Sequence, residues 1–71
     1  TLKFSVKEKQ YLKIVLFDLQ GRLIKIIVSQ NFNEGDQTFQ VSTSDLSSGA
    51  YLVCIRNKYN ATISSVKLSV D

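Results

Sequence analysis

Six short segments of alternating apolar and polar residues run through this 71-residue chain, with turn-forming residues between them. Apolar side chains at every second position give a strand one buried face, whereas an amphipathic helix needs a period of about 3.6 residues. No segment follows the helical period, and the chain contains no proline. We therefore predict an all-β fold whose strands cover residues 1–6, 11–18, 22–29, 37–41, 50–56 and 61–70.

Tight turns are predicted between several of these strands. Asp18 supplies an acceptor at the first position of a turn and Gly21 stands at the fourth, the pattern of a type I turn followed by a left-handed residue. Residues 31–36, which include Gly35, are expected to form a longer loop. Both faces of the strand 11–18 are largely apolar, so this strand is either central in a sheet or covered from outside the domain.

The stretch from Asp45 to Ile55 changes from a polar turn into an apolar strand. Leu46 can pack under the turn, Gly49 can adopt a positive φ, and Tyr51 begins a strand face of alternating apolar residues. A tyrosine a few residues after a buried leucine is similar to the tyrosine corner of immunoglobulin-like domains, where the phenol hydroxyl bonds to the upstream backbone. The pattern predicts an immunoglobulin-like antiparallel β-sandwich.

The number of strands is one short of the usual seven for such a sandwich. Alternation is already under way at Thr1, so we expect the first strand to be missing from this chain. Residues 1–71 would then be a single domain of a larger protein. A six-stranded barrel is the alternative. The open edge invites strand exchange or edge pairing with another chain, and what replaces the missing strand stays open.

The composition excludes several kinds of catalytic and metal site. There is no histidine, which excludes Ser-His-Asp and Cys-His catalysis, and the single cysteine, Cys54, cannot form an internal disulfide. No two carboxylates are placed by the sequence to share a cleft as acid and base. We expect no enzyme activity, no cofactor and no metal. Asp18 should act as a turn acceptor and Asp45 as a cap, with a calcium site at these two residues as the alternative.

The basic residues are too dispersed to indicate a nucleic-acid partner. Nine basic and six acidic residues give a net charge of +3, and only the stretch Lys7–Lys13 approaches a cluster. Solvated strand faces that discourage edge pairing explain this spread better. No run approaches the roughly 18 apolar residues of a membrane span.

One apolar patch is predicted outside the core. If the second and fifth strands are neighbours, as their counterparts in a seven-stranded sandwich are, four side chains share the outer face of the sheet: Val15, Phe17, Leu52 and Cys54. Contiguous exposed apolar area usually marks a docking site. The alternative is that other segments or long lysine side chains cover the patch. Cys54 is expected to be a small apolar residue rather than a reactive thiol.

Landmarks along the whole chain resemble the C-terminal sorting domain of type IX secretion cargo, a family of the Bacteroidetes. In order they are Leu16-Phe-Asp18-Leu-Gln-Gly21-Arg22, a loop with Gly35, Asp45-Leu46-Ser-Ser-Gly49-Ala-Tyr51-Leu-Val53, and Val66-Lys67-Leu-Ser-Val70. The signature positions of the family fall on Asp18, Gly21, Arg22, Gly49, Tyr51 and Lys67. The chain departs from the family in lacking an Asn-Pro opening and in ending with Val70-Asp71, where lysine is frequent.

The resemblance implies a non-catalytic signal that directs a larger cargo through the periplasm and across the outer membrane. Its partners would be the type IX translocon and a sortase-like peptidase that commonly removes the domain. The cargo would be secreted or held at the cell surface. Which cargo this is, and whether the domain is cleaved or retained, are not specified by the resemblance.

Two kinds of role are expected among the signature residues. Gly21, Gly49 and Tyr51 have backbone or packing reasons to be there, whereas the exposed charges of Arg22 and Lys67 are candidates for direct contact with a receptor. The alternative function is a structural or adhesive immunoglobulin-like module, either a spacer or a carbohydrate-binding accessory. For carbohydrate binding, Tyr11 and Tyr59 would form only a small aromatic platform.

Overall fold

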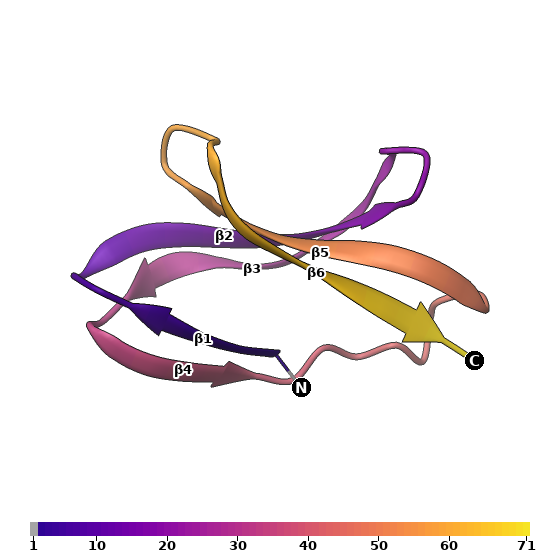
Figure 1. Ribbon diagram of the computed structural model, residues 1–71, viewed down its shortest axis with the longest axis horizontal. Coiled ribbons are helices and arrows are strands. Elements are labelled where there is room, and N and C mark those ends of the chain that lie inside the picture. The colour runs from indigo at the N-terminus through magenta and orange to yellow at the C-terminus, as the bar shows by residue number, and fades with distance from the viewer. Residues whose placement is uncertain (1) are drawn as a thin grey trace.

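A computed structural model describes residues 2–71 as six β-strands in two layers (Figure 1). The described residues contain no helix, which confirms the all-β prediction. Thr1, the first residue of the first predicted strand, lies outside the described residues. The strands are β1 (Leu2–Val6), β2 (Gln10–Asp18), β3 (Leu23–Phe32), β4 (Gly35–Phe39), β5 (Gly49–Asn57) and β6 (Thr62–Val70).

The strands form two separate antiparallel sheets rather than one closed barrel. The larger sheet has the order β3-β2-β5-β6, and the smaller one pairs β1 with β4. The predicted neighbours, the second and fifth strands, are therefore confirmed as hydrogen-bonded partners. The β1–β4 pair covers one face of the larger sheet, and the two layers pack as a sandwich (Figure 1).

The core lies between the two layers and is built from alternate residues of the central strands. Ile14 and Leu16 of β2 are completely buried, because the neighbouring strands flank them and the smaller sheet covers them. Tyr51 and the alternate residues after it face this core, as the period of two predicted. The buried cluster consists of Leu2, Val6, Leu12, Ile14, Leu16, Phe32, Tyr51, Val53 and Ile55.

The predicted loop over residues 31–36 is wrong. β3 continues to Phe32 and β4 begins at Gly35, so only two residues remain between these strands. The reason is the side chain of Phe32, which is 3% exposed and makes edge-to-face contacts with Phe4 and Phe39 at centroid distances of 5.5 and 6.0 Å. A buried aromatic cluster thus keeps a polar stretch in the sheet. β4 ends at Phe39, two residues before the predicted end.

Candidate recognition surfaces

The turn between β2 and β3 is organised by one carboxylate. Oδ1 of Asp18 accepts hydrogen bonds from the backbone N–H groups of Gln20 (3.0 Å) and Arg22 (2.9 Å). Oδ2 accepts a third bond from Nε of Arg22 at 3.1 Å. The N–H of Gly21 bonds to the carbonyl of Asp18, and the φ of +86° at Gly21 favours glycine. The predicted turn geometry is confirmed.

These bonds keep Asp18 ionised although its side chain is nearly enclosed. They lower the pKa of Asp18 below 3.8, with the backbone N–H of Arg22 as the largest cause; burial opposes this, and the guanidinium of Arg22 adds to the lowering. The side chain of Arg22 remains 80% exposed while its Nε is held by the carboxylate. The turn therefore presents a cation to solvent in a defined orientation.

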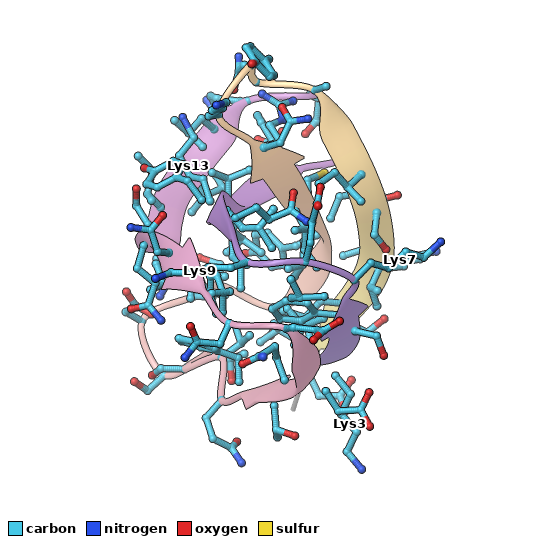
Figure 2. The ribbon with its side chains drawn as sticks, turned by 90° about the vertical axis from the view of Figure 1, so that its left-hand side faces the viewer. Lys3, Lys7, Lys9 and Lys13 are labelled. Carbon is cyan, nitrogen blue, oxygen red and sulfur yellow. The ribbon has the colours of Figure 1, made fainter. Side chains whose placement is uncertain are left out.

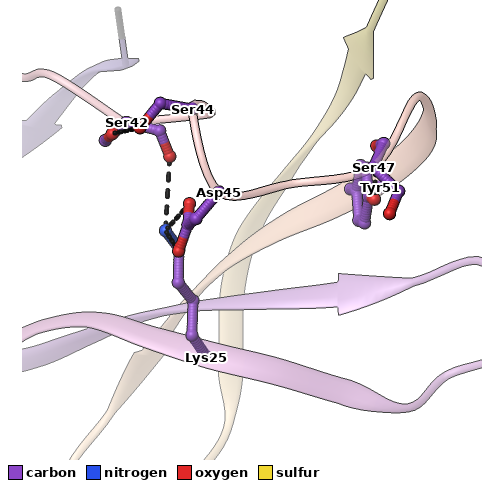
Figure 3. Close-up of polar contacts among 6 residues, drawn as sticks. All are labelled: Lys25, Ser42, Ser44, Asp45, Ser47 and Tyr51. Atoms are coloured by element: carbon purple, nitrogen blue, oxygen red, sulfur yellow. Dashed lines mark hydrogen bonds and ion pairs between the residues drawn. The ribbon is translucent and has the colours of Figure 1, made fainter.

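The corner before β5 is held by the hydroxyl of Tyr51. Its Oη donates a hydrogen bond of 2.7 Å to the carbonyl of Ser47, and both residues are drawn in Figure 3. Leu46 is half-buried against the core, and its N–H bonds to the carbonyl of Thr43. Gly49 has a φ of +148°. The tyrosine-corner geometry predicted for this stretch is confirmed.

A lysine on β3 ties down the loop that leads to this corner. Nζ of Lys25 donates to both carboxylate oxygens of Asp45, at 3.1 and 3.3 Å, and to the carbonyl of Ser42 at 3.3 Å (Figure 3). The Lys25 bond is the main cause that lowers the pKa of Asp45. The carboxylate of Asp45 thus reaches Lys25 across twenty residues of sequence, and a hydrogen bond with its own backbone N–H also lowers its pKa. Whether it caps the turn, as predicted, stays a prediction.

Residues of the turn and of the corner together line an open hollow of about 510 Å³ at one end of the sandwich. Four of the six signature positions, Asp18, Arg22, Gly49 and Tyr51, line this hollow. Gly21 lies within the same turn, whereas Lys67 lies on β6, outside the residues that line the hollow. The structure thus brings most of the signature together and separates Lys67 from it.

The calcium alternative finds little support in this hollow. Asp18 and Asp45 both line it, but one carboxylate is engaged by Arg22 and the other by Lys25. Within residues 2–71, no group of three or more histidine, cysteine, aspartate or glutamate residues is arranged to hold a metal ion. Calcium prefers six to eight oxygen ligands, which two occupied carboxylates do not approach.

The four residues of the predicted apolar patch do share the outer face of the larger sheet. Val15 lies opposite Cys54, and Phe17 lies opposite Leu52. The structure supports the covered alternative for the first pair: Val15 is 3% and Cys54 8% exposed, although neither belongs to the core cluster. Arg56 and Phe17 stand in the rows on either side of this pair and contact each other, so together they help to cover it.

The remaining aromatic and basic candidates do not form a platform or a stripe. Tyr11 and Tyr59 both line a hollow of about 270 Å³, but Nζ of Lys58 lies 5.2 Å from the ring centroid of Tyr59 and the hydroxyl of Tyr11 bonds to Ser29. In Figure 2, Lys7 points away on the opposite side from Lys9 and Lys13. The described residues also contain no helix long and apolar enough to cross a membrane.

Two long-range contacts were not predicted from the sequence, that of Lys25 with Asp45 and that of Arg56 with Phe17. Lys25 bonds to a loop twenty residues away, and no local pattern signals such a contact. For Arg56, alternation along β5 places it on the same face as Cys54, which was a usable signal. Only the register between β2 and β5 shows that it can reach Phe17.

Comparison with known families gives one match. Residues 1–70 match the family model described as secretion system C-terminal sorting domain. No curated protein and no solved structure matches the chain. The match spans the whole sandwich, including the turn, the corner and the outer face.

Proposed function

The chain belongs to the secretion system C-terminal sorting domain family, and from this premise we propose that the type IX machinery reads it as a folded module through exposed basic side chains. Membership makes the chain a sorting signal for type IX secretion, which marks proteins for export across the outer membrane to the cell surface or the medium. It implies contact with the secretion machinery and favours a non-enzymatic role.

The proposal extends to the arrangement of the whole protein. Residues 1–71 are one domain at the end of a larger cargo, and a sortase-like peptidase removes it after export. A single core cluster with residues from β1, β2, β3 and β5 supports one cooperative unit. Such a unit can be recognised as a shape and then detached without disturbing the cargo.

Direct contact with the receptor is assigned to Arg22 and Lys67. Arg22 projects from the rim of the hollow with an exposed side chain, and Lys67 is exposed on the edge strand β6. One row of paired residues crosses all four strands of the larger sheet: Leu23, Phe17, Leu52 and Lys67. Leu23, which follows Arg22 in the sequence, therefore lies three strand spacings, about 14 Å, from Lys67. The two cations therefore lie on different sides of the module: Arg22 bonds to the inward-facing Asp18 at the rim of the hollow, and Lys67 lies on the outer face of the larger sheet. Asp18, Gly21, Gly49 and Tyr51 maintain the turn and the corner.

The test is export of a reporter in a Bacteroidetes host. A signal peptide and a fluorescent protein are fused to this chain, and reporter is measured in the medium and on the surface with and without an intact type IX translocon. We expect translocon-dependent export, and a strong loss for the double variant Arg22→Ala with Lys67→Ala. The matched control replaces two other exposed lysines, Lys3→Ala with Lys9→Ala, and should be exported normally.

Two results would contradict the proposal. Normal export of a double variant whose melting is unchanged removes Arg22 and Lys67 from the contact. A folded fusion that stays in the periplasm favours the alternative of a structural or adhesive module that remains on the mature protein.

We also propose that an extended strand from another chain adds at the open side of the sandwich. β6 is an edge strand, and Val66, which faces inward opposite Val53, is 47% exposed. A groove of about 300 Å³ beside it is lined by apolar side chains that include Leu2, Val53 and Leu68. Sedimentation at increasing concentration should reveal dimers, and a strict monomer at all concentrations would contradict strand addition between copies.

A further inference from the structure

The outer face of the larger sheet buries apolar side chains without a second layer of strands. By register, Ile26, Val15 and Cys54 form one row across β3, β2 and β5. Val15 and Cys54 are as buried as residues of the core, whereas Ile26 at the edge is 52% exposed. The smaller sheet lies on the opposite side (Figure 1). Side chains of the larger sheet itself must therefore exclude water from the centre of this face.

Together with the ring of Phe17, the side chain of Arg56 covers this centre. Its guanidinium carbon lies 4.8 Å from the ring centroid of Phe17. Arg56 stands opposite Lys13, and the Val15–Cys54 pair lies between that row and Phe17, so the arginine crosses over the pair to reach the ring. Its Nε is buried and has no hydrogen-bond partner among the described residues. A guanidinium with a free donor thus lies on an apolar floor.

The charges around this cover have one sign. Lys13 lies beside Arg56 on β2, and Lys67 lies opposite Leu52 on β6, both on the outer face by register. Within residues 2–71, no strand position that the register places on this face is an aspartate or glutamate. The turns β2–β3 and β5–β6 bend away from the smaller sheet at the two ends of the face (Figure 1). The face is therefore apolar, cationic and bounded at both ends.

A second copy of the chain is unsuited to bind the outer face. A symmetric contact through this face would bring Lys13, Arg56 and Lys67 against the same residues of the partner, and like charges in a partly dry interface oppose association. A carboxylate can accept bidentate, charge-assisted hydrogen bonds from the two terminal Nη groups of Arg56, and it would reach the buried Nε only after the side chain lifts off the sheet. Apolar side chains next to that carboxylate would pack on Leu23 and Ile26, which are both about half exposed.

We propose that this face binds an acidic, apolar peptide segment of a partner protein, with Arg56 as the residue that takes the carboxylate. The inference goes beyond the proposed receptor contact of Arg22 and Lys67, because it assigns a carboxylate to Arg56 at the sheet centre; Lys67 lies at the edge of the same face. Export can therefore depend on Arg22 whether or not the face binds peptide, and peptide can bind in the absence of any translocon.

The experiment measures binding of a short fluorescent peptide that alternates leucine and glutamate to the purified chain. We expect saturable binding that weakens as ionic strength rises, and about tenfold or greater loss of affinity for Arg56→Ala. Arg56→Lys should bind with intermediate affinity, since it keeps the charge and loses the bidentate geometry. Lys3→Ala, which removes the same charge from the smaller sheet, should bind normally.

Several results would overturn the proposal. These are no binding by the native chain, equal binding of a leucine–glutamine peptide, or unchanged affinity for folded Arg56→Lys and Arg56→Ala. Binding to phosphatidylglycerol vesicles without binding to the peptide would assign the face to a lipid surface instead. A dimer that dissociates on substitution of Arg56 would assign it to a second copy. If Arg56→Ala fails to fold, Arg56→Lys decides the question.

Discussion

The two faces of the larger sheet have similar apolar centres and very different covers. Ile14, Leu16 and Val53 on the inner face lie under β1 and β4, which add further apolar side chains. Val15 and Cys54 on the outer face are nearly as buried, but they lie on the side away from the smaller sheet, where the long side chain of Arg56 meets the ring of Phe17. A cover of packed strands is removed only by unfolding, whereas one long side chain can move aside. The comparison places the packed core on the inner face, and the peptide binding that we propose for Arg56 on the outer one.

The largest expected effect tests the inner face. Ile14→Ala removes a completely buried side chain from the middle of the core and should lower the free energy of unfolding by about 2–5 kcal/mol. The matched change on the outer face, Leu52→Ala, should cost less than about 2 kcal/mol because Leu52 is only half-buried. Urea unfolding monitored by circular dichroism gives both values. Equal losses would contradict the division between the two faces.

A smaller loss of unfolding free energy is expected for a change in the corner that precedes β5. Tyr51→Phe keeps the ring in the core and removes the hydrogen bond to the carbonyl of Ser47, at a cost of about 1 kcal/mol. Tyr59→Phe is the control, since Tyr59 is 77% exposed and should show no change in unfolding. An unchanged free energy of unfolding for Tyr51→Phe would mean that packing alone fixes the corner.

The turn between β2 and β3 should make stability depend on pH. The folded state lowers the pKa of Asp18 below 3.8, chiefly through the N–H of Arg22, so the folded state favours the ionised carboxylate. This contribution is present above about pH 4 and is lost as the pH falls through the lowered pKa. The melting temperature of the native chain should therefore fall more steeply below pH 4 than that of Asp18→Asn. Parallel curves for the two proteins would contradict this role of Asp18.

The smallest effect on stability is expected for the outer cover. Arg56→Ala removes a contact with the ring of Phe17 worth about 0.5–1 kcal/mol. Its chemical effect should be larger, because Cys54 is a free, buried thiol beneath the arginine. Alkylation of Cys54 in the folded chain should be several-fold faster in this variant than in Lys3→Ala. Equal rates would mean that other side chains protect the thiol.

Features set by neighbouring residues could be predicted from the sequence. The turn from Asp18 to Arg22 and the corner before Tyr51 depend on contacts over at most four residues, and both match the structure. The inward face of β5 follows from simple alternation. These elements establish a sandwich, and the family match supplies the sorting role.

Features set by distant residues could not be predicted. Phe32 lies in a polar stretch, and its burial depends on Phe4 and Phe39 from other strands. The Lys25–Asp45 pair joins a strand to a loop, which local propensity does not encode. The sequence left open whether the outer patch is exposed or covered, because Arg56 reaches Phe17 only through the register of β2 and β5.

Methyl chemical shifts during titration with the leucine–glutamate peptide test the separation of the two faces most directly. The account predicts shifts at the outer methyl groups of Val15, Ile26 and Leu52, and none at Ile14 or Leu16 in the same sheet. Shifts that spread equally to the inner methyl groups, or that appear on neither face, would contradict it.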